Sequence, residues 1–160
     1  MPSFHLESAE RMEVFFEEHE ADLLRGLLQE LRALLDTDMP GDAVRQRLFP
    51  RAYQEEEDER SYRELVGDDL ERRRKAAVIA LQQRLGPSGA AHMSLTRDEA
   101  DSLLRILTDL RLAIGTRLGV TEEAMNDELD PSRPDAPAWT VLHWLGWVQE
   151  SMLEKISGPE

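Results

Sequence analysis

The sequence predicts an all-α fold: a single compact bundle of about five or six helices. Apolar residues, mostly leucine, recur at three- and four-residue spacing over several long stretches, which is the period of one helix face. Proline and glycine interrupt this pattern between the stretches. The 160 residues are 41% hydrophobic and 32% charged, which is ordinary for one globular domain. We therefore expect residues 1–160 to form one domain.

The residues before position 17 leave two interpretations open. Residues 4–6 and 12–16 alternate and contain residues that favour strands, and residues 8–11 could form the turn between them. The bundle would then carry a short N-terminal β-hairpin, which is the interpretation we favour. The same residues could instead extend the next helix toward the N-terminus.

Two segments have the clearest helical pattern. Residues 17–35 open with acidic residues that complement the helix dipole, and a leucine stripe follows. The stripe consists of Leu23, Leu24, Leu27, Leu28, Leu31, Leu34 and Leu35. Residues 97–118 follow Thr96, which with Glu99 makes a capping box. Gly119 is well placed to end that helix.

Further helices are predicted between the loops. They are residues 42–48, residues 55–85, a short segment that begins at residues 122–123, and residues 138–156. Residues 55–85 are one long helix or two abutting helices, because Gly67 is a weak point. Residues 86–89 and residues 127–137, which contain three prolines, are predicted to be loops.

Charge and composition exclude several classes of function. The chain has 19 Lys and Arg against 33 Asp and Glu, a net charge of −14. Such an acidic surface repels phosphate backbones, so we do not expect direct contact with nucleic acid. No apolar run approaches the ~20 residues of a membrane span, and no secretory signal is visible, so we expect a cytoplasmic protein. The absence of cysteine excludes thiol catalysis, zinc–thiolate sites and a disulfide switch.

No motif for catalysis, cofactor binding or metal binding is present. Phosphate-binding glycine loops, HExxH and GxSxG are all missing, so we expect a protein that is not an enzyme and holds no cofactor or metal. No histidine has a glutamate three residues before it, as a ferritin-like metal bundle requires. His19, among Glu17, Glu18 and Glu20, could be a metal ligand, but we favour a solvated histidine. The acidic residues 55–59 could bind a cation or a basic partner, or simply begin a helix.

Arg72, Arg73, Arg74 and Lys75 are the one basic cluster in the sequence. A nucleic-acid site would need aromatic or further basic neighbours, which are missing nearby. Acidic residues four positions earlier favour ion pairs along a helix instead. These acids are Asp68, Asp69 and Glu71. We therefore favour a salt-bridged surface, with a contact to an anion or a partner as the alternative.

The three tryptophans, Trp139, Trp144 and Trp147, lie within nine residues. On a helix, Trp144 and Trp147 fall on one side and the leucines fall toward another. A helix that is apolar on two sides is either central to a bundle or shared between core and partner. Because large aromatic rings are frequent interface anchors, the tryptophans are candidates for a dimer or partner contact. A purely structural role in the core is the alternative.

Arg111 and Arg117 form a second candidate contact. They lie about 120° apart around a helix, so they need not share a partner. Gly115 between them costs about 1 kcal/mol relative to alanine inside a helix, and would suit a place where another backbone comes close. Helix packing with ion pairs at its edge explains the same residues without a partner.

Three pieces of the sequence, taken in order, resemble a known family. They are LFPRAY at residues 48–53 with an acidic spacer and Asp69-Leu70, DLRLAIGTRLG at residues 109–119, and Trp144-Leu145-x-x-x-Gln149-Glu150. Their order resembles an actinobacterial family long filed as a domain of unknown function and associated with an actinomycete oxidative-stress regulator (AosR-like). The likeness covers residues 12–156, and DLRLAIGTRLG is its most specific part. Thr108 departs from the asparagine expected in the family.

The resemblance implies a cytosolic protein that acts through a protein partner, such as an alternative sigma factor, in a transcriptional stress response. Regulator-type members of the family sense oxidation through paired cysteines, which this chain lacks. We therefore expect a regulatory protein–protein interaction module, acting as a homodimer, without that redox switch. An accessory role in Clp proteolysis, implied by the family's gene neighbourhood, is one alternative. Direct DNA binding through the basic cluster is the other.

Overall fold

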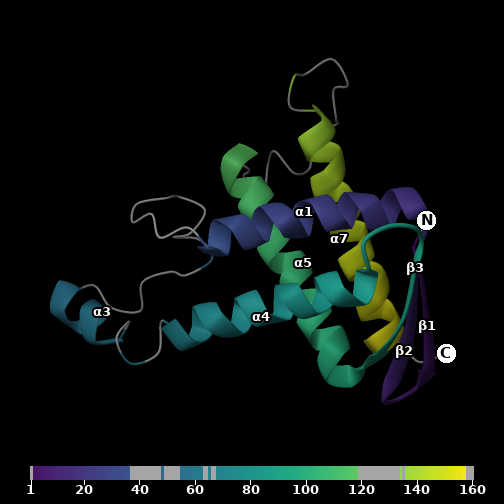
Figure 1. Cartoon of the computed structure of the whole chain (residues 1–160), viewed down its shortest axis with the longest axis horizontal. Coiled ribbons are helices and arrows are strands. Elements are labelled where there is room, and N and C mark those ends of the chain that lie inside the picture. Colours follow the sequence, from purple (N-terminus) through teal and green to yellow (C-terminus); the bar gives the residue numbers. More distant parts are fainter. Residues whose placement is uncertain are drawn as a thin grey trace.

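The computed structural model describes residues 2–36, 48, 55–62, 65, 68–118, 134 and 136–157 (Figure 1). Within these residues the fold is mostly helical, with five helices and one three-stranded antiparallel sheet. The predicted helical bundle and its N-terminal hairpin are therefore confirmed. None of the described helices combines the length and the apolar character needed to cross a membrane.

Four of the five described helices form two crossed pairs, and the sheet lies at one end of them (Figure 1). Helices α1 and α4 run antiparallel to each other and cross the antiparallel pair α5 and α7. The helices are α1 (Glu18–Asp36), α3 (Glu56–Tyr62), α4 (Asp68–Leu85), α5 (Arg97–Leu118) and α7 (Ala136–Ser157); the strands are β1 (Ser3–Ser8), β2 (Arg11–Phe16) and β3 (Ala91–Thr96). This arrangement places α5 between α7 on one side and the first pair on the other.

Most predicted helices appear near their expected bounds. The two clearest predictions, residues 17–35 and 97–118, correspond to α1 and α5. The prediction over residues 55–85 corresponds to two helices, α3, which ends at Tyr62, and α4, which begins at Asp68. Gly67, the predicted weak point, lies outside the described residues. The helices predicted at residues 42–48 and from residue 122 fall outside the described residues, apart from the buried Leu48.

The sheet is larger than the predicted hairpin, because β3 pairs with β2. The hairpin has the register Phe4↔Val14, and on the other side of β2 Val14 lies opposite Met93. Alternation turns one face toward the core, while His5 and His92 are exposed on the other. The sequence interpretation was incomplete here. Residues 91–96 alternate as a half-buried strand should, but they are short and run directly into a helix cap.

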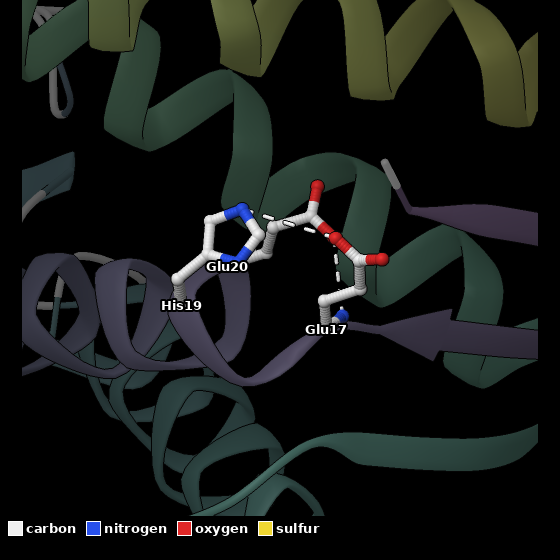
Figure 2. A group of neighbouring side chains, drawn as sticks. All are labelled: Glu17, His19 and Glu20. Atoms are coloured by element: carbon white, nitrogen blue, oxygen red, sulfur yellow. Dashed lines mark hydrogen bonds and ion pairs between the residues drawn. The ribbon is translucent and has the colours of Figure 1, made fainter.

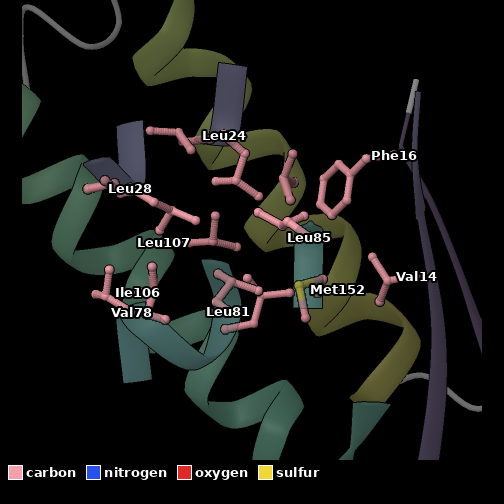
Figure 3. Packing of buried hydrophobic residues seen from close by; sticks show 14 of the residues in the cluster. Val14, Phe16, Leu24, Leu28, Val78, Leu81, Leu85, Ile106, Leu107 and Met152 are labelled. Atoms are coloured by element: carbon pink, nitrogen blue, oxygen red, sulfur yellow. The ribbon is translucent and has the colours of Figure 1, made fainter. Parts of the chain in front are cut away.

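The core joins the sheet to four helices (Figure 3). The labelled residues are Val14 and Phe16 of β2, Leu24 and Leu28 of α1, Val78, Leu81 and Leu85 of α4, Ile106 and Leu107 of α5, and Met152 of α7. All of these side chains are buried. Full burial of each such side chain is worth roughly 1.5–3 kcal/mol, so the predicted leucine stripes account for much of what holds the elements together.

The capping box predicted at the start of α5 is confirmed. The Glu99 N–H donates to Thr96 Oγ1 at 3.2 Å, and the Thr96 N–H donates back to Glu99 Oε1 at 3.0 Å. The backbone N–H of Thr96 is also the main cause of a lowered pKa at Glu99. Since Thr96 is the last residue of β3, this one cap joins the sheet to the central helix without a loop.

Arg25 of α1 holds the turn that follows α4. Its Nε donates to the Gly86 carbonyl at 2.9 Å, and its Nη2 donates to the carbonyls of Leu85 and Gly89 at 2.9 and 2.7 Å. Gly86 and Gly89 have φ of 74° and 85°, a region that side chains other than glycine rarely adopt. The turn therefore depends on two glycines for its shape and on one arginine for its position.

We expect Thr96→Ala to lower the free energy of unfolding by about 1 kcal/mol, because the α5 cap loses its side-chain acceptor. Thr96→Ser keeps the hydroxyl and is the matched control, expected to stay close to wild type. Urea denaturation of the three proteins measures the difference. Equal losses in both variants would mean that strand packing at this position, rather than the cap, supplies the stability.

We expect Arg25→Ala to cost about 2–4 kcal/mol, since hydrogen bonds to a charged donor are worth more than neutral ones and three carbonyls lose theirs. Arg25→Lys should recover only part of this loss, because one ammonium cannot span the same three acceptors. Thermal and urea unfolding provide the measurement. A loss no larger than that of a typical surface substitution would show that water replaces the guanidinium at these carbonyls.

Candidate functional site

The outward members of the basic cluster on α4 are paired with carboxylates. Arg73 Nε lies 3.0 Å from Asp69, as predicted, and Arg72 lies 3.9 Å from the same residue. Lys75, for which a partner on its own helix was predicted, instead contacts Asp36 of α1. These residues thus form the salt-bridged surface that the spacing favoured, and their charges are partly neutralised.

Arg74 is turned inward, away from its neighbours in the cluster. Its Nη1 lies 3.5 Å from Asp109 Oδ1 and donates to the Leu48 carbonyl at 2.7 Å. Asp109 is only 5% exposed. Burial raises the pKa of its carboxyl more than the nearby Arg74 and Arg105 lower it. Arg74 therefore ties α4 to α5 and does not share a surface with Arg72 and Arg73.

The three tryptophans differ in how far they are exposed to solvent. Trp139 is 5% exposed, and Trp144 is half-buried with its ring 6.4 Å from that of Phe16 in β2. Trp147 is 38% exposed. The shared side predicted for Trp144 and Trp147 therefore does not form one surface, because the first faces the sheet. Of the three candidates for an interface, Trp147 is the one that faces solvent.

Trp147 lies on the outer face of α7 among polar side chains. His143, Glu150 and Glu154 stand four residues before, three after and seven after it, so all share one helix face, and each is exposed. One large aromatic ring is thus flanked by two carboxylates. Such a face suits a partner that offers an apolar contact together with positive charge.

Arg111 lies in the seam between α5 and α7. Its Nη1 donates to Gln149 Oε1 at 2.9 Å, and Gln149 Nε2 donates to the Leu104 carbonyl at 3.3 Å and to the Thr108 hydroxyl. A Cβ at Gly146 would lie 3.5 Å from the Arg111 Cζ. The guanidinium therefore packs over a position that has no side chain. The sequence interpretation expected the close approach of another backbone at Gly115 and did not single out Gly146.

Two of the sequence pieces that carried the family resemblance meet in this seam. Arg111 belongs to the block at residues 109–119, and Gln149 belongs to the piece that begins at Trp144. Arg117 does not join them. It is exposed near the end of α5, whereas Arg111 is half-buried. The two arginines have separate environments, as their helical spacing indicated.

Glu17, His19 and Glu20 come together at the start of α1 (Figure 2), with ligand atoms within 4.8 Å of one another. His19 Nε2 lies 3.9 Å from Glu17 Oε2, and its side chain is 77% exposed. The buried Glu20 accepts the Glu17 N–H at 3.1 Å, so it occupies the position that Glu99 has in the α5 cap. Helix capping accounts for the burial of Glu20, and the exposure of His19 fits the solvated histidine that we favoured.

A crevice of about 210 Å³ opens where the hairpin turn, the start of α5 and the end of α7 meet. Its apolar wall includes Leu6, Met12 and Ile156, and Arg11 and Arg97 also line it. Pockets for small molecules usually measure about 300–1,000 Å³. The crevice is therefore smaller than a typical ligand site.

Comparison with known proteins assigns a family but no activity. A family model described as a domain of unknown function, DUF2017, matches residues 1–156. No curated protein and no solved structure shows significant similarity to the chain.

The raised pKa of Asp109 predicts a pH dependence of stability. A carboxyl whose pKa is higher in the folded state favours folding most when protonated, and that contribution falls as the pH rises through the folded-state value. Relative to Asp109→Asn, we expect wild type to lose stability as the pH rises from about 3.8, the ordinary value, until Asp109 is ionised in both states. Urea unfolding between pH 3.5 and 7 measures this difference.

Asp101→Asn is the control for this measurement, because Asp101 lies on the same helix but is 59% exposed. The free energy of unfolding of wild type minus that of Asp101→Asn should not fall over the same pH interval. If the free energy of unfolding of wild type minus that of Asp109→Asn instead rises with pH, the attraction of Arg74 outweighs the effect of burial. That result would contradict the raised pKa of Asp109.

Proposed function

We propose that this chain, which belongs to the DUF2017 family, works by binding another protein through the outer face of α7. The observation that supports this most is the 38% exposure of Trp147. A tryptophan contributes roughly 150–250 Å² of surface when it is fully covered, and the exposed part of the Trp147 ring is available for a contact with a partner. Residues of this type are the most frequent energetic centres of interfaces.

The partner we propose is a component of the transcription machinery, such as an alternative sigma factor, in a cytoplasmic stress response. Support comes from the resemblance to AosR-like proteins, carried by residues 109–119 and 144–150. The chain has no cysteine, so the trigger differs from oxidation of a cysteine pair. Direct DNA binding through the basic cluster on α4 is less favoured, because Arg74 is buried against Asp109 and the other members contact carboxylates.

Self-association is a separate proposal. Two copies that met through the same face of α7 would bring Glu150 and Glu154 of each copy close together, and like charges in contact oppose association. A homodimer would therefore use another surface and leave Trp147 available. Sedimentation of wild type and Trp147→Ala tests this arrangement, which requires the same oligomeric state for both proteins.

We expect Trp147→Ala to reduce recovery of the partner by about 10- to 30-fold, since loss of a central aromatic costs about 2 kcal/mol at an interface. The experiment is affinity purification of the tagged chain from its own cells, with quantitative mass spectrometry. Leu70→Ala is the matched control, because Leu70 on α4 is exposed to a similar extent, 37%. Circular dichroism establishes that each variant is folded.

The identity of what is recovered decides between the roles. A sigma factor or polymerase subunit that depends on Trp147 supports transcriptional control. Recovery of Clp components alone would replace that role with an accessory function in proteolysis. Equal recovery by wild type and Trp147→Ala would show that the outer face of α7 is not the binding surface.

A further inference from the structure

Arg111 has fewer acceptors than Arg25 and Arg74, two other arginines that are partly buried in the described part of the chain. Arg32, also partly buried, resembles Arg111 in bonding to one neutral amide oxygen, that of Gln82. Arg25, 14% exposed, bonds to three carbonyls and to Asp22 at 2.6 Å. Arg74, 15% exposed, has Asp109 and the Leu48 carbonyl. Among the described residues, Arg111 bonds only to the neutral amide oxygen of Gln149. Its positive charge therefore lacks the compensation that the fold gives to Arg25 and Arg74.

The unsatisfied part of the Arg111 group can be located. A guanidinium has five N–H donors and no acceptor, and Gln149 takes one from Nη1. The Nε of Arg111 is buried and has no hydrogen-bond partner. Arg74 shares this feature at its own Nε, but its Nη1 has a carboxylate and a carbonyl as acceptors. A buried donor without an acceptor is costly, and a partly buried cation without a charged partner is stabilised when an anion binds to it.

The residues around Arg111 hold the guanidinium in one orientation. Gln149 accepts from it and is itself fixed by donating to Thr108 and to the Leu104 carbonyl. On the other side, the guanidinium lies over Gly146, where a side chain would be in contact with Nη2 and Cζ at 3.5 Å. A guanidinium that is already oriented loses less conformational entropy on binding a planar, two-oxygen group.

We propose that Arg111 is a binding site for an anionic oxygen group, a carboxylate or a phosphate, in the seam between α5 and α7. Guanidinium and carboxylate or phosphate form two parallel hydrogen bonds, which are among the strongest that proteins make. Gln149 and Thr108 position the arginine and do not need to touch the anion. The site is separate from Trp147, which lies on the outer face of α7, so it does not depend on the proposed protein interface.

The test is an anion titration of wild type followed by thermal unfolding and by NMR of the arginine Nε–Hε groups, at constant ionic strength. Inorganic phosphate and acetate are the small probes, and an acidic hexapeptide is the third. At about tenfold excess over its dissociation constant, a bound anion should raise the melting temperature by roughly 3–6 °C for a chain of this size. The Arg111 Nε–Hε resonance should shift with the same concentration dependence.

The variants identify the residue responsible. Arg111→Gln should abolish the rise in melting temperature, and Arg111→Lys should keep only part of it, because an ammonium cannot make the paired hydrogen bonds. Arg117→Gln, on the same helix but exposed, should respond like wild type. A response to phosphate or acetate indicates a free anion as the natural ligand, and a response to the peptide alone indicates an acidic side chain of a protein.

Two outcomes would overturn the site. One is an Arg111 resonance that does not move with any of the three probes. The other is an equal response in wild type and Arg111→Gln. The NMR signal is measured on wild type, so the test remains decisive even if Arg111→Gln folds poorly. Trp147→Ala should bind the anion normally, which separates a failure of this site from a failure of the proposed protein interface.

Discussion

Burial of α5 from two sides is the constraint on which the rest of the structure depends. Leu103, Leu107 and Leu110 are at most 3% exposed, and the helix packs against α7 on one side and against α1 and α4 on the other. A helix covered over so much of its circumference has little room for its polar residues. Asp109 and Arg111 are consequently drawn into contacts between helices, and each needs a specific partner there.

Asp109 and Arg111 have partners of different charge. Asp109 has a charged partner in Arg74, and its raised pKa shows that desolvation still outweighs the attraction. Arg111 has only a neutral partner in Gln149. The contact between Asp109 and Arg74 links α4 to α5 and has a structural role. The contact between Arg111 and Gln149 leaves the positive charge of the arginine uncompensated between α5 and α7. This difference makes the α5–α7 seam the more informative place to look for function.

The sequence predicted what depends on local periodicity and capping, and it predicted little of what depends on neighbours in space. The helices α1, α5 and α7 and the Thr96–Glu99 cap follow from spacing alone, because each is set within one or two turns. Strand β3 was missed because six alternating residues gain their stability from β2, far away in the sequence. The inward turn of Arg74 and the packing of Arg111 over Gly146 were missed for the same reason. Helical phase likewise put Trp144 and Trp147 on one side, but only the position of the sheet decides which of them is covered.

The order of the strands has a consequence for how the chain is made. Strand β2 is the centre of the sheet, yet its second neighbour is synthesised much later than β2 itself: Arg11 bonds to Ser94, 83 positions away. Until β3 has been synthesised, one edge of β2 is open and Met12, Val14 and Phe16 lack part of their cover. An unpaired, apolar edge of this kind invites association with other chains. We therefore expect the chain to be most prone to aggregation before β3 pairs with β2.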